Sequence, residues 1–364
     1  MEGFRRRVWA VPVAVAVLLG AGCSEPVTRD AAPARTEAVP AQGPVPAQSP
    51  APAQSQAAPH GPPLTQSAAE IRRTVGSLRR VDDLPLYEMT FHGSYDPEAP
   101  LTEEELAAPA GAWACSLFAL PAARPGDRPL FGRNFDWGPH PAMVVHADPP
   151  GGHASVSIAD LFYTLGSTAP PDLSDPVTRR RMAHAVLLPF DGVNEKGLAV
   201  GMAQVPEGGV PPGSADRPDV GSVRIIRLML DRAATVDEAV AIMRRYDVDF
   251  GSDPQLHYLI ADAAGRSAVV EYARGRMNVI EDRVLTNFTM TGTGKPARTA
   301  DNRYRELDAG LAGARTWRDG MELLRRVAQG HTRWSVVYDL ADGTARVVTG
   351  KRWERVHTIP LRRG

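Results

Sequence analysis

Apolar and polar residues follow two different periods along the chain from about residue 67 onward. Apolar positions at helical spacing predict helices over 67–80, 223–232, 236–246, 301–311 and 317–329. Runs rich in β-branched and aromatic residues predict strands over 84–91, 115–120, 130–137, 186–190, 198–203, 257–262, 268–272, 283–286, 334–340 and 344–349. Strands in hairpin runs, interrupted by blocks of helices, favour an α+β fold with helices packed on antiparallel sheets.

One predicted hairpin has consequences for chemistry. The strands 115–120 and 130–137 are joined by a turn that contains Pro, Gly and Asp, so the second strand returns alongside the first. This pairing would bring Arg133 and Asp136 back towards Cys115. Because the two charged residues are three apart on a strand, they point to opposite faces unless a bulge or a twist re-aims one of them.

The N-terminal end has the composition of an export signal. Arg5, Arg6 and Arg7 precede an apolar stretch over 8–19 that is short for a permanent membrane span, and small residues lead into Cys23. We therefore expect a lipoprotein signal peptide over 1–23, with lipid attached to Cys23. An ordinary signal peptide with an incidental cysteine is the alternative, and in both cases the mature protein works outside the cytoplasm.

Composition and charge narrow the other possibilities. Residues 24–66 are rich in Pro, Ala and Gln, which predicts a disordered linker that acts as a tether. The formal net charge of −1 gives no basic field, so we expect no nucleic-acid partner. The nine histidines show no ligand spacing, and no phosphate loop or dinucleotide fingerprint is present in the sequence, so we expect neither metal nor cofactor.

Cysteine usage singles out one thiol. The chain has two cysteines, and if Cys23 is lipidated then Cys115 has no disulfide partner. A lone thiol outside the cytoplasm is either a small buried apolar residue or a reactive group. A Cys–His pair would need His146, His184 or His257 to reach Cys115, and nothing in the sequence selects among these three.

Short strings around and after Cys115 carry a family resemblance. In chain order they are Trp113-Ala114-Cys115-Ser116-Leu117-Phe118, Phe131-Gly132-Arg133-Asn134-Phe135-Asp136-Trp137, Asp191-Gly192-Val193-Asn194-Glu195-Lys196-Gly197-Leu198, Val284-Leu285-Thr286-Asn287 and Asp301-Asn302-Arg303-Tyr304. Taken together they resemble the choloylglycine hydrolase and penicillin V acylase family of N-terminal-nucleophile (Ntn) hydrolases, or linear amide C–N hydrolases. The resemblance covers about residue 77 to the C-terminus, and 77–90 is similar to the pro-segment of exported bacterial members.

The resemblance implies a fold and a domain organisation. The fold would be an Ntn-hydrolase αββα sandwich, in which two antiparallel sheets are flanked by helices. Residues 67–114 would form a pro-segment and 115–364 the catalytic domain, with autocleavage between Ala114 and Cys115.

The resemblance also implies roles around the nucleophile. Once Cys115 is the new N-terminus, its own α-amine lies beside its thiol and can act as the base, with no need for a histidine. Asp136 would orient this amine, and the charge of Arg133 would favour the thiolate. A surface ion pair on the hairpin is the alternative for Arg133 and Asp136.

Three further residues match family positions that stabilise charge. Asn287 would supply a side-chain amide to the oxyanion, and the backbone N–H of Gln204 would be the second donor. Gln204 stands where many members have asparagine, which leaves substrate fit open. Arg303 would neutralise charge near the nucleophile, and a solvated helix charge is its alternative.

The chain departs from the best-known family members in the 114 residues that precede Cys115. The pro-segment is either cut and retained, as in the related acid ceramidases and N-acylethanolamine amidases, or it stays uncut and the enzyme is inactive. We favour cleavage with retention, because 84–91 carries apolar surface that can pack into a sheet.

These observations predict an exported, membrane-anchored cysteine amidase that cleaves an N-acylated small molecule through a Cys115 thioester. Candidate substrates are N-acyl amino acids, fatty amides, acyl-homoserine lactones, conjugated bile acids and penicillin V. Acyl transfer of the isopenicillin N acyltransferase type, or a catalytically silent lipoprotein that binds an acylated ligand, are the alternatives. The oligomeric state stays open, with a homo-oligomer as one option.

Overall fold

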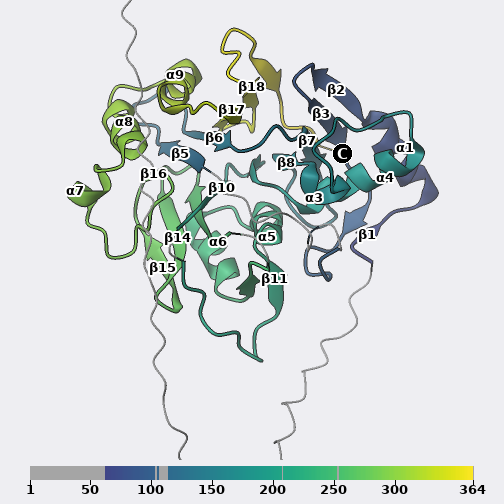
Figure 1. The fold of residues 1–364 in the computed structure, drawn as a ribbon, viewed down its shortest axis with the longest axis horizontal. Coiled ribbons are helices and arrows are strands. Elements are labelled where there is room, and N and C mark those ends of the chain that lie inside the picture. The colour runs from purple at the N-terminus through teal and green to yellow at the C-terminus, as the bar shows by residue number, and fades with distance from the viewer. Residues whose placement is uncertain (1–61, 103–104, 106–113, 207, 252–253, 364) are drawn as a thin grey trace, which may run out of the picture. The chain divides into compact units, whose positions relative to one another are not determined.

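The computed structural model describes residues 62–102, 105, 114–206, 208–251 and 254–363, all of which belong to the unit Gln54–Gly364 (Figure 1). The predicted signal peptide with Cys23, and nearly all of the predicted linker, lie outside the described residues. The same holds for most of the segment between Leu101 and Ala114.

A nine-stranded sheet forms one layer of the unit, in the order β15-β14-β13-β10-β9-β8-β7-β3-β2. Its strands are β2 (Arg79–Asp82), β3 (Leu86–Thr90), β7 (Ala142–Ala147), β8 (Ser155–Asp160), β9 (Asp191–Asn194), β10 (Ala199–Gln204), β13 (Leu256–Ala261), β14 (Ser267–Ala273) and β15 (Arg276–Ile280). Neighbours pair antiparallel except β3 and β7, which are parallel.

A six-stranded antiparallel sheet forms the second layer, in the order β16-β5-β6-β17-β18-β19. Its strands are β5 (Ala114–Leu120), β6 (Leu130–Asp136), β16 (Val284–Leu285), β17 (Thr332–Asp339), β18 (Ala345–Thr349) and β19 (His357–Ile359). Two small ribbons pair β1 (Leu64–Thr65) with β4 (Ser94–Tyr95) and β11 (Asp219–Gly221) with β12 (Asp247–Asp249). The hairpin expected from the sequence is confirmed, because β5 and β6 pair from Ala114↔Asp136 to Leu120↔Leu130.

Helices cover the outer faces of the two sheets. The helices α8 (Asn302–Leu311) and α9 (Trp317–Val327) pack on the six-stranded sheet, and α5 (Arg224–Arg232) and α6 (Val236–Met243) pack on the nine-stranded one (Figure 1). The inner faces meet at β5 and β10, where a Cβ on Gly201 would lie 2.7 Å from Cδ2 of Leu117. The α+β sandwich of antiparallel sheets flanked by helices is therefore confirmed.

Shorter helices complete the unit. They are α1 (Ala68–Ser77), α3 (Phe162–Leu165), α4 (Pro176–Met182), the 3₁₀ helix η1 (Ala183–Leu187) and α7 (Lys295–Arg298). Capping boxes at Ser67, Thr235 and Thr316 set where α1, α6 and α9 begin. The first predicted helix is too long by a few residues, because Arg79 and Arg80 belong to β2.

The stretch 186–190 differs from the expected strand. Most of it belongs to η1 or to the residues just after it, and the strand is β9, over the stretch that we expected to be a turn. The backbone of β9 pairs with β8 on one side and β10 on the other, so tertiary pairing outweighs the local turn preference of Asp191 and Gly192. β7, β8 and β15 were not predicted at all.

The N-terminal part of the described chain is built into the nine-stranded sheet. β3 lies between β2 and β7, and the side chains of Leu86 and Met89 are fully buried. Asp82 accepts hydrogen bonds from Thr349 (3.0 Å) and Arg352, and it contacts His357 (2.5 Å) near the C-terminus. These contacts join residues before Cys115 to elements formed by residues far after it.

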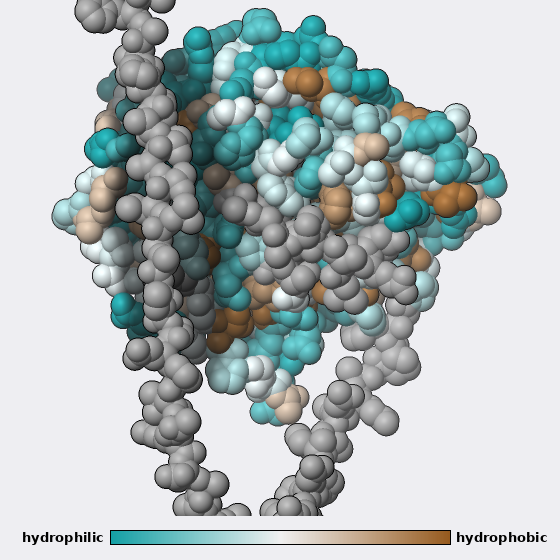
Figure 2. Space-filling model, viewed as in Figure 1, coloured by the Kyte–Doolittle hydropathy of each residue, from teal (hydrophilic) through white to brown (hydrophobic). Residues whose placement is uncertain are grey.

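The surface in Figure 2 is a mosaic, and on the visible described part apolar residues occur in small separate groups among hydrophilic ones. Within the described ranges, no helix combines the length and the apolar character that crossing a membrane requires.

Candidate active site

Cys115 lies at the start of the β5 strand, opposite Phe135 of β6, and its side chain is fully buried. Ala114 precedes it in the same strand, opposite Asp136, and is half-buried. The peptide bond between Ala114 and Cys115 is intact in this structure, so the geometry is that of the uncut chain.

Arg133 lies between the thiol and a buried carboxylate. Its Nη2 is 3.6 Å from Sγ of Cys115, and its Nη1 donates to the carboxylate of Asp191 (2.7 Å) and to the carbonyl of Phe190 (2.6 Å). Asp191 also accepts from the indole of Trp334 (3.1 Å) and from the hydroxyl of Tyr338. Because Arg133 and Asp191 are both fully buried, this is a desolvated ion pair and not a surface pair on the hairpin.

Burial and charge oppose each other at the thiol. Burial raises the pKa of Cys115 above its ordinary value, and the nearby charge of Asp136 acts in the same direction. The charge and the hydrogen bond of Arg133 lower the pKa, but they do not outweigh burial. The thiol of the uncut chain is therefore neutral at pH 7.

Asp136 ends the β6 strand next to an irregularity. Between Thr332 and Trp334 of β17 the register against β6 shifts, directly opposite Asp136 and Phe135. The Asp136 carboxylate accepts from Thr332 and from Gln329 (2.8 Å), and it lies 3.9 Å from Arg303. Burial raises its pKa. β6 itself pairs with β5 without a register shift, so the structure shows an irregularity on β17 and no bulge between Arg133 and Asp136.

Asn287 links three of the predicted residues. Its Oδ1 accepts from the backbone N–H of Cys115 (2.6 Å) and from Arg303 (3.1 Å), and its Nδ2 donates to the carbonyl of Gln204 (2.8 Å). Arg303, in the first turn of α8, also donates to the carbonyl of Cys115 (2.9 Å). The side-chain amide of Asn287 therefore lies beside the backbone of Cys115, the position from which such a group can act on an oxyanion.

The histidines proposed for a Cys–His pair have other contacts. His146 binds Glu88 (2.9 Å), and His257 lies between Glu271 (3.0 Å) and the carbonyl of Thr286 (2.8 Å). His184 lines a separate surface groove beside α1 and α4. Among the described residues no cluster of three or more His, Cys, Asp or Glu side chains could hold a metal ion.

The structure thus brings together Cys115, Arg133, Asp136, Asn287, Arg303 and the backbone of Gln204. Sequence reasoning missed the residues that hold these groups in place, which are Asp191, Gln329, Thr332, Trp334 and Tyr338. Asp191 begins one of the strings that carry the resemblance, and its place there could have indicated a role in the site. The other four act through long-range pairing, which leaves no local pattern.

Comparisons with known proteins agree with the motifs. Residues 177–291 match the model of the linear amide C–N hydrolases, choloylglycine hydrolase family, a stretch that contains Gln204 and Asn287. Over 192 residues the chain is 27% identical to Penicillin V acylase of Pectobacterium atrosepticum. That match covers 48% of this chain and 49% of the relative, so the chain spans about half the length of the curated relative.

Solved structures support the fold. A variant of the conjugated bile acid hydrolase from Clostridium perfringens matches with a TM-score of 0.51 and 14% identity, over 68% of this chain and 92% of that one. Penicillin V acylase from Agrobacterium tumefaciens matches with a TM-score of 0.49 and 18% identity, over 68% and 86%. The first of these likenesses shows the Ntn-hydrolase fold. Together with the match over residues 177–291, it agrees with the resemblance to the choloylglycine hydrolase family of linear amide C–N hydrolases that the sequence motifs carry.

Proposed function

We propose that this protein is a self-activating cysteine amidase that hydrolyses the linear amide bond of an N-acylated small molecule. The observation that carries the proposal is the convergence of three polar side chains on one buried residue, Cys115. Arg133 contacts its thiol, Asn287 accepts from its backbone N–H, and Arg303 donates to its carbonyl. A structural cysteine needs none of these partners. The family match, and the activities named for the relatives, support the same class of reaction.

Activation begins with the bond before the nucleophile. Sγ of Cys115 attacks the carbonyl carbon of Ala114, and the bond from that carbon to the nitrogen of Cys115 breaks. The resulting thioester is hydrolysed by water. The products are a carboxylate on Ala114 and a free α-amine on Cys115. This amine is on the same residue as the thiol and, with an ordinary pKa of about 8, can take the thiol proton near neutral pH.

Turnover then uses the same groups. The amine accepts the thiol proton, Sγ attacks the substrate carbonyl, and the side-chain amide of Asn287 donates to the developing oxyanion. The leaving nitrogen takes the proton from the amine, and water resolves the thioester. Arg133 stabilises the thiolate by charge. Asp136, held by Thr332 and Gln329, lies near the end of β5 where it can orient the new amine.

We also propose that the protein is exported and anchored by lipid at Cys23. The basic residues 5–7, the apolar stretch 8–19 and the small residues before Cys23 support this. The substrate class would be N-acyl amino acids, fatty amides, acyl-homoserine lactones, conjugated bile acids or penicillin V.

Intact-mass spectrometry of the purified protein tests the proposal. Wild type should give two masses that correspond to cleavage after Ala114, and the N-terminal fragment should carry the mass of lipid on Cys23. Cys115→Ala should give one uncut chain. A wild-type chain that is uncut and still has thiol-dependent amidase activity would contradict the N-terminal-nucleophile mechanism.

A further inference from the structure

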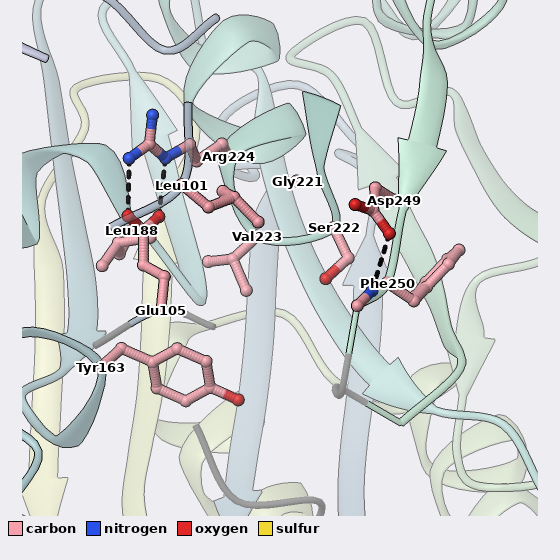
Figure 3. A pocket seen from close by; sticks show the side chains of 11 residues that line it. Leu101, Glu105, Tyr163, Leu188, Gly221, Ser222, Val223, Arg224, Asp249 and Phe250 are labelled. Atoms are coloured by element: carbon pink, nitrogen blue, oxygen red, sulfur yellow. Dashed lines mark hydrogen bonds and ion pairs between the residues drawn. The ribbon is translucent and has the colours of Figure 1, made fainter. Parts of the chain in front are cut away.

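A second arginine–carboxylate pair lies in a small pocket that joins distant parts of the chain (Figure 3). Leu101 and Glu105, from the segment before Cys115, form one side of the pocket. Tyr163, Leu188 and the start of α5 at Arg224 form the other.

Arg224 binds Glu105 in the geometry that guanidinium groups use for carboxylates. Nε and Nη2 each donate to one carboxylate oxygen at 2.6 Å (Figure 3). Nη1 donates to the carbonyl of Ala99 at 2.6 Å. The side chain of Arg224 is 1% exposed. Within the described part of the chain, Glu105 is the one carboxylate that pairs with Arg224.

Neighbouring charges do not share this role. Arg227, one turn along α5, is paired with Asp231 (2.7 Å) and Ser155 (2.7 Å). Asp249 also lines the pocket, but its carboxylate accepts from the backbone N–H of Gly251 (2.8 Å) and turns away from Arg224 (Figure 3). Arg224 is therefore the cation that the pocket offers to a carboxylate.

The chain itself fills this pocket. The free volume that remains is about 20 Å³, which is room for about one water molecule. Leu101 packs so closely that a Cβ on Gly221 would lie 2.8 Å from its Cδ2. A small-molecule site needs roughly 300 Å³ or more, so a ligand can enter only where Leu101 and Glu105 now lie.

A short chain of aromatic contacts connects the pocket to the nucleophile. Tyr163 packs on Phe190 with ring centroids 5.1 Å apart, and Phe190 packs on Phe135 at 5.4 Å. Phe135 is the strand partner of Cys115, and the carbonyl of Phe190 binds Arg133. The pocket thus adjoins the aromatic layer that lies beside the thiol.

We propose that Arg224 is the carboxylate-binding group of the substrate pocket, that Glu105 and Leu101 occupy its place in the uncut chain, and that the substrates are N-acyl amino acids. The inference rests on the proposed amidase function. An N-acyl amino acid carries an apolar chain, an amide and a carboxylate, and so supplies both groups that Leu101 and Glu105 now supply. Cleavage after Ala114 releases Glu105 from its covalent link to β5, and the substrate carboxylate then competes for Arg224.

Every bond and proton of the reaction is accounted for in this arrangement. The acyl carbon bonds to Sγ of Cys115 as the amide C–N bond breaks, and the leaving nitrogen takes the former thiol proton. A free amino acid departs, and water releases the fatty acid from the thioester. Arg224 holds the carboxylate throughout and transfers no proton.

Paired substrates test the proposal in the cleaved, full-length protein. They are an N-dodecanoyl amino acid and its primary carboxamide, which differ only in the carboxylate. The readout is the ratio of kcat/KM for the acid to kcat/KM for the carboxamide. Arg224→Gln should lower this ratio by about tenfold or more, and Arg224→Lys should lower it less because the charge stays. Glu105→Gln should raise the ratio through a lower KM for the acid.

Arg232→Gln is the matched control, because Arg232 lies on the same helix and pairs with Glu98 (3.1 Å) on the segment before Cys115. It should leave the ratio within about twofold of wild type. Equal effects of the Arg224 variants on both substrates, or an unchanged ratio, would overturn the inference.

A binding measurement distinguishes this inference from the amidase proposal. In a Cys115→Ala background, which cannot turn over, Glu105→Gln should strengthen binding of the N-dodecanoyl amino acid by about tenfold in equilibrium dialysis. Binding of the carboxamide should not change. Failure of this prediction overturns the carboxylate site whether or not wild type hydrolyses either substrate, and absent hydrolysis with intact binding counts against the amidase proposal alone.

Discussion

The guanidinium group of Arg133 contacts both the Cys115 thiol and the Asp191 carboxylate. With Asp191 ionised and the thiol neutral, the buried trio has no net charge. Ionising the thiol adds one negative charge to a fully buried site, and this cost explains why the pKa of Cys115 is raised even beside an arginine. Arg133 therefore opposes the rise in the pKa of Cys115 without reversing it in the uncut chain.

The double substitution Arg133→Gln and Asp191→Asn should raise the thiol pKa further, by roughly one unit or more. Removing both charges avoids leaving either partner buried and uncompensated, which a single substitution would do. The measurement is the rate of alkylation of Cys115 against pH, with the protein unfolded in a parallel sample. An alkylation midpoint at or below that of wild type would show that Arg133 does not act on the thiol.

Asn287→Ala should lower kcat by about a hundredfold with little change in KM, if its side-chain amide binds the oxyanion. Asn302→Ala is the control, because Asn302 lies nearby in the exposed first turn of α8, where it binds only Arg305 among the contacts described. Stopped assays under substrate saturation measure kcat. A loss confined to KM would mean that Asn287 positions substrate in the ground state.

The sequence predicts the groups that do chemistry better than the groups that hold them. Cys115, Arg133 and Asp136 stand in short strings, and these strings also carry the family resemblance. Gln329 and Thr332, which bind Asp136, lie almost two hundred residues further along the chain. Their role depends on the pairing of β6 with β17, and no local pattern records that pairing.

At the scale of elements, the segment that carries Asn287 is held by a buried carboxylate on β14. Glu271 accepts from the backbone N–H groups of Met290 (3.0 Å) and Thr291 (2.7 Å) and contacts His257. Burial alone would raise the pKa of Glu271, but the hydrogen bonds and the charge of His257 outweigh it and lower the pKa to about 2. The two ring nitrogens of His257 contact the Glu271 carboxylate and the carbonyl of Thr286.

Glu271→Gln should therefore remove stability that depends on pH. A carboxyl whose folded pKa lies below its unfolded value stabilises the fold fully above the unfolded value of about 4.5 and loses this effect as the pH falls towards 2. The shift corresponds to about 3 kcal/mol at neutral pH. Urea unfolding between pH 7 and pH 3 should show a gap between wild type and variant that narrows as the pH falls.

Glu322→Gln is the matched control, since Glu322 lies on the exposed face of α9 and pairs only with Arg325 at 3.4 Å among the contacts described. It should change the free energy of unfolding by less than about 0.5 kcal/mol. A gap for Glu271→Gln that is constant over this pH range would mean that the loss comes from packing and not from titration.

The elements that the sequence predicted well have strong local signals. The capping box at Thr235 marks the start of α6, and the turn at Asp342-Gly343 marks the final hairpin. β7 and β8 are buried along their whole length. The apolar run of β7 lacks the polar alternation that marks a half-exposed strand, whereas β8 alternates serine with apolar residues and was still missed. β9 replaces an expected turn because two neighbouring strands pair with it.

At the scale of the whole molecule, residues on both sides of Cys115 form one sheet. If the chain is cut after Ala114, the two fragments should stay together, because β3 of the N-terminal fragment pairs with β7 of the other and its side chains are buried. The cut protein should elute as one species in size exclusion, and the fragments should separate only in denaturant.

Leu86→Ala combined with Met89→Ala should release the N-terminal fragment from the cut protein, because each truncation of a buried side chain costs about 2–5 kcal/mol. Val177→Ala, at a position that is 63% exposed, is the control and should leave the fragments together. Co-elution of the fragments in the double variant would show that contacts other than β3 hold them.

The pairing of β3 with β7 determines how long the two cut fragments stay together. Release of the N-terminal fragment would require the ladder between β3 and β7 to open. If the proposed lipid anchor is on one fragment and the nucleophile on the other, the residence time of the catalyst at the membrane would be the reciprocal of that opening rate. Such rates in folded domains span sub-second to days. The packing of one strand would then set the rate at which the enzyme is released into the medium, without a protease.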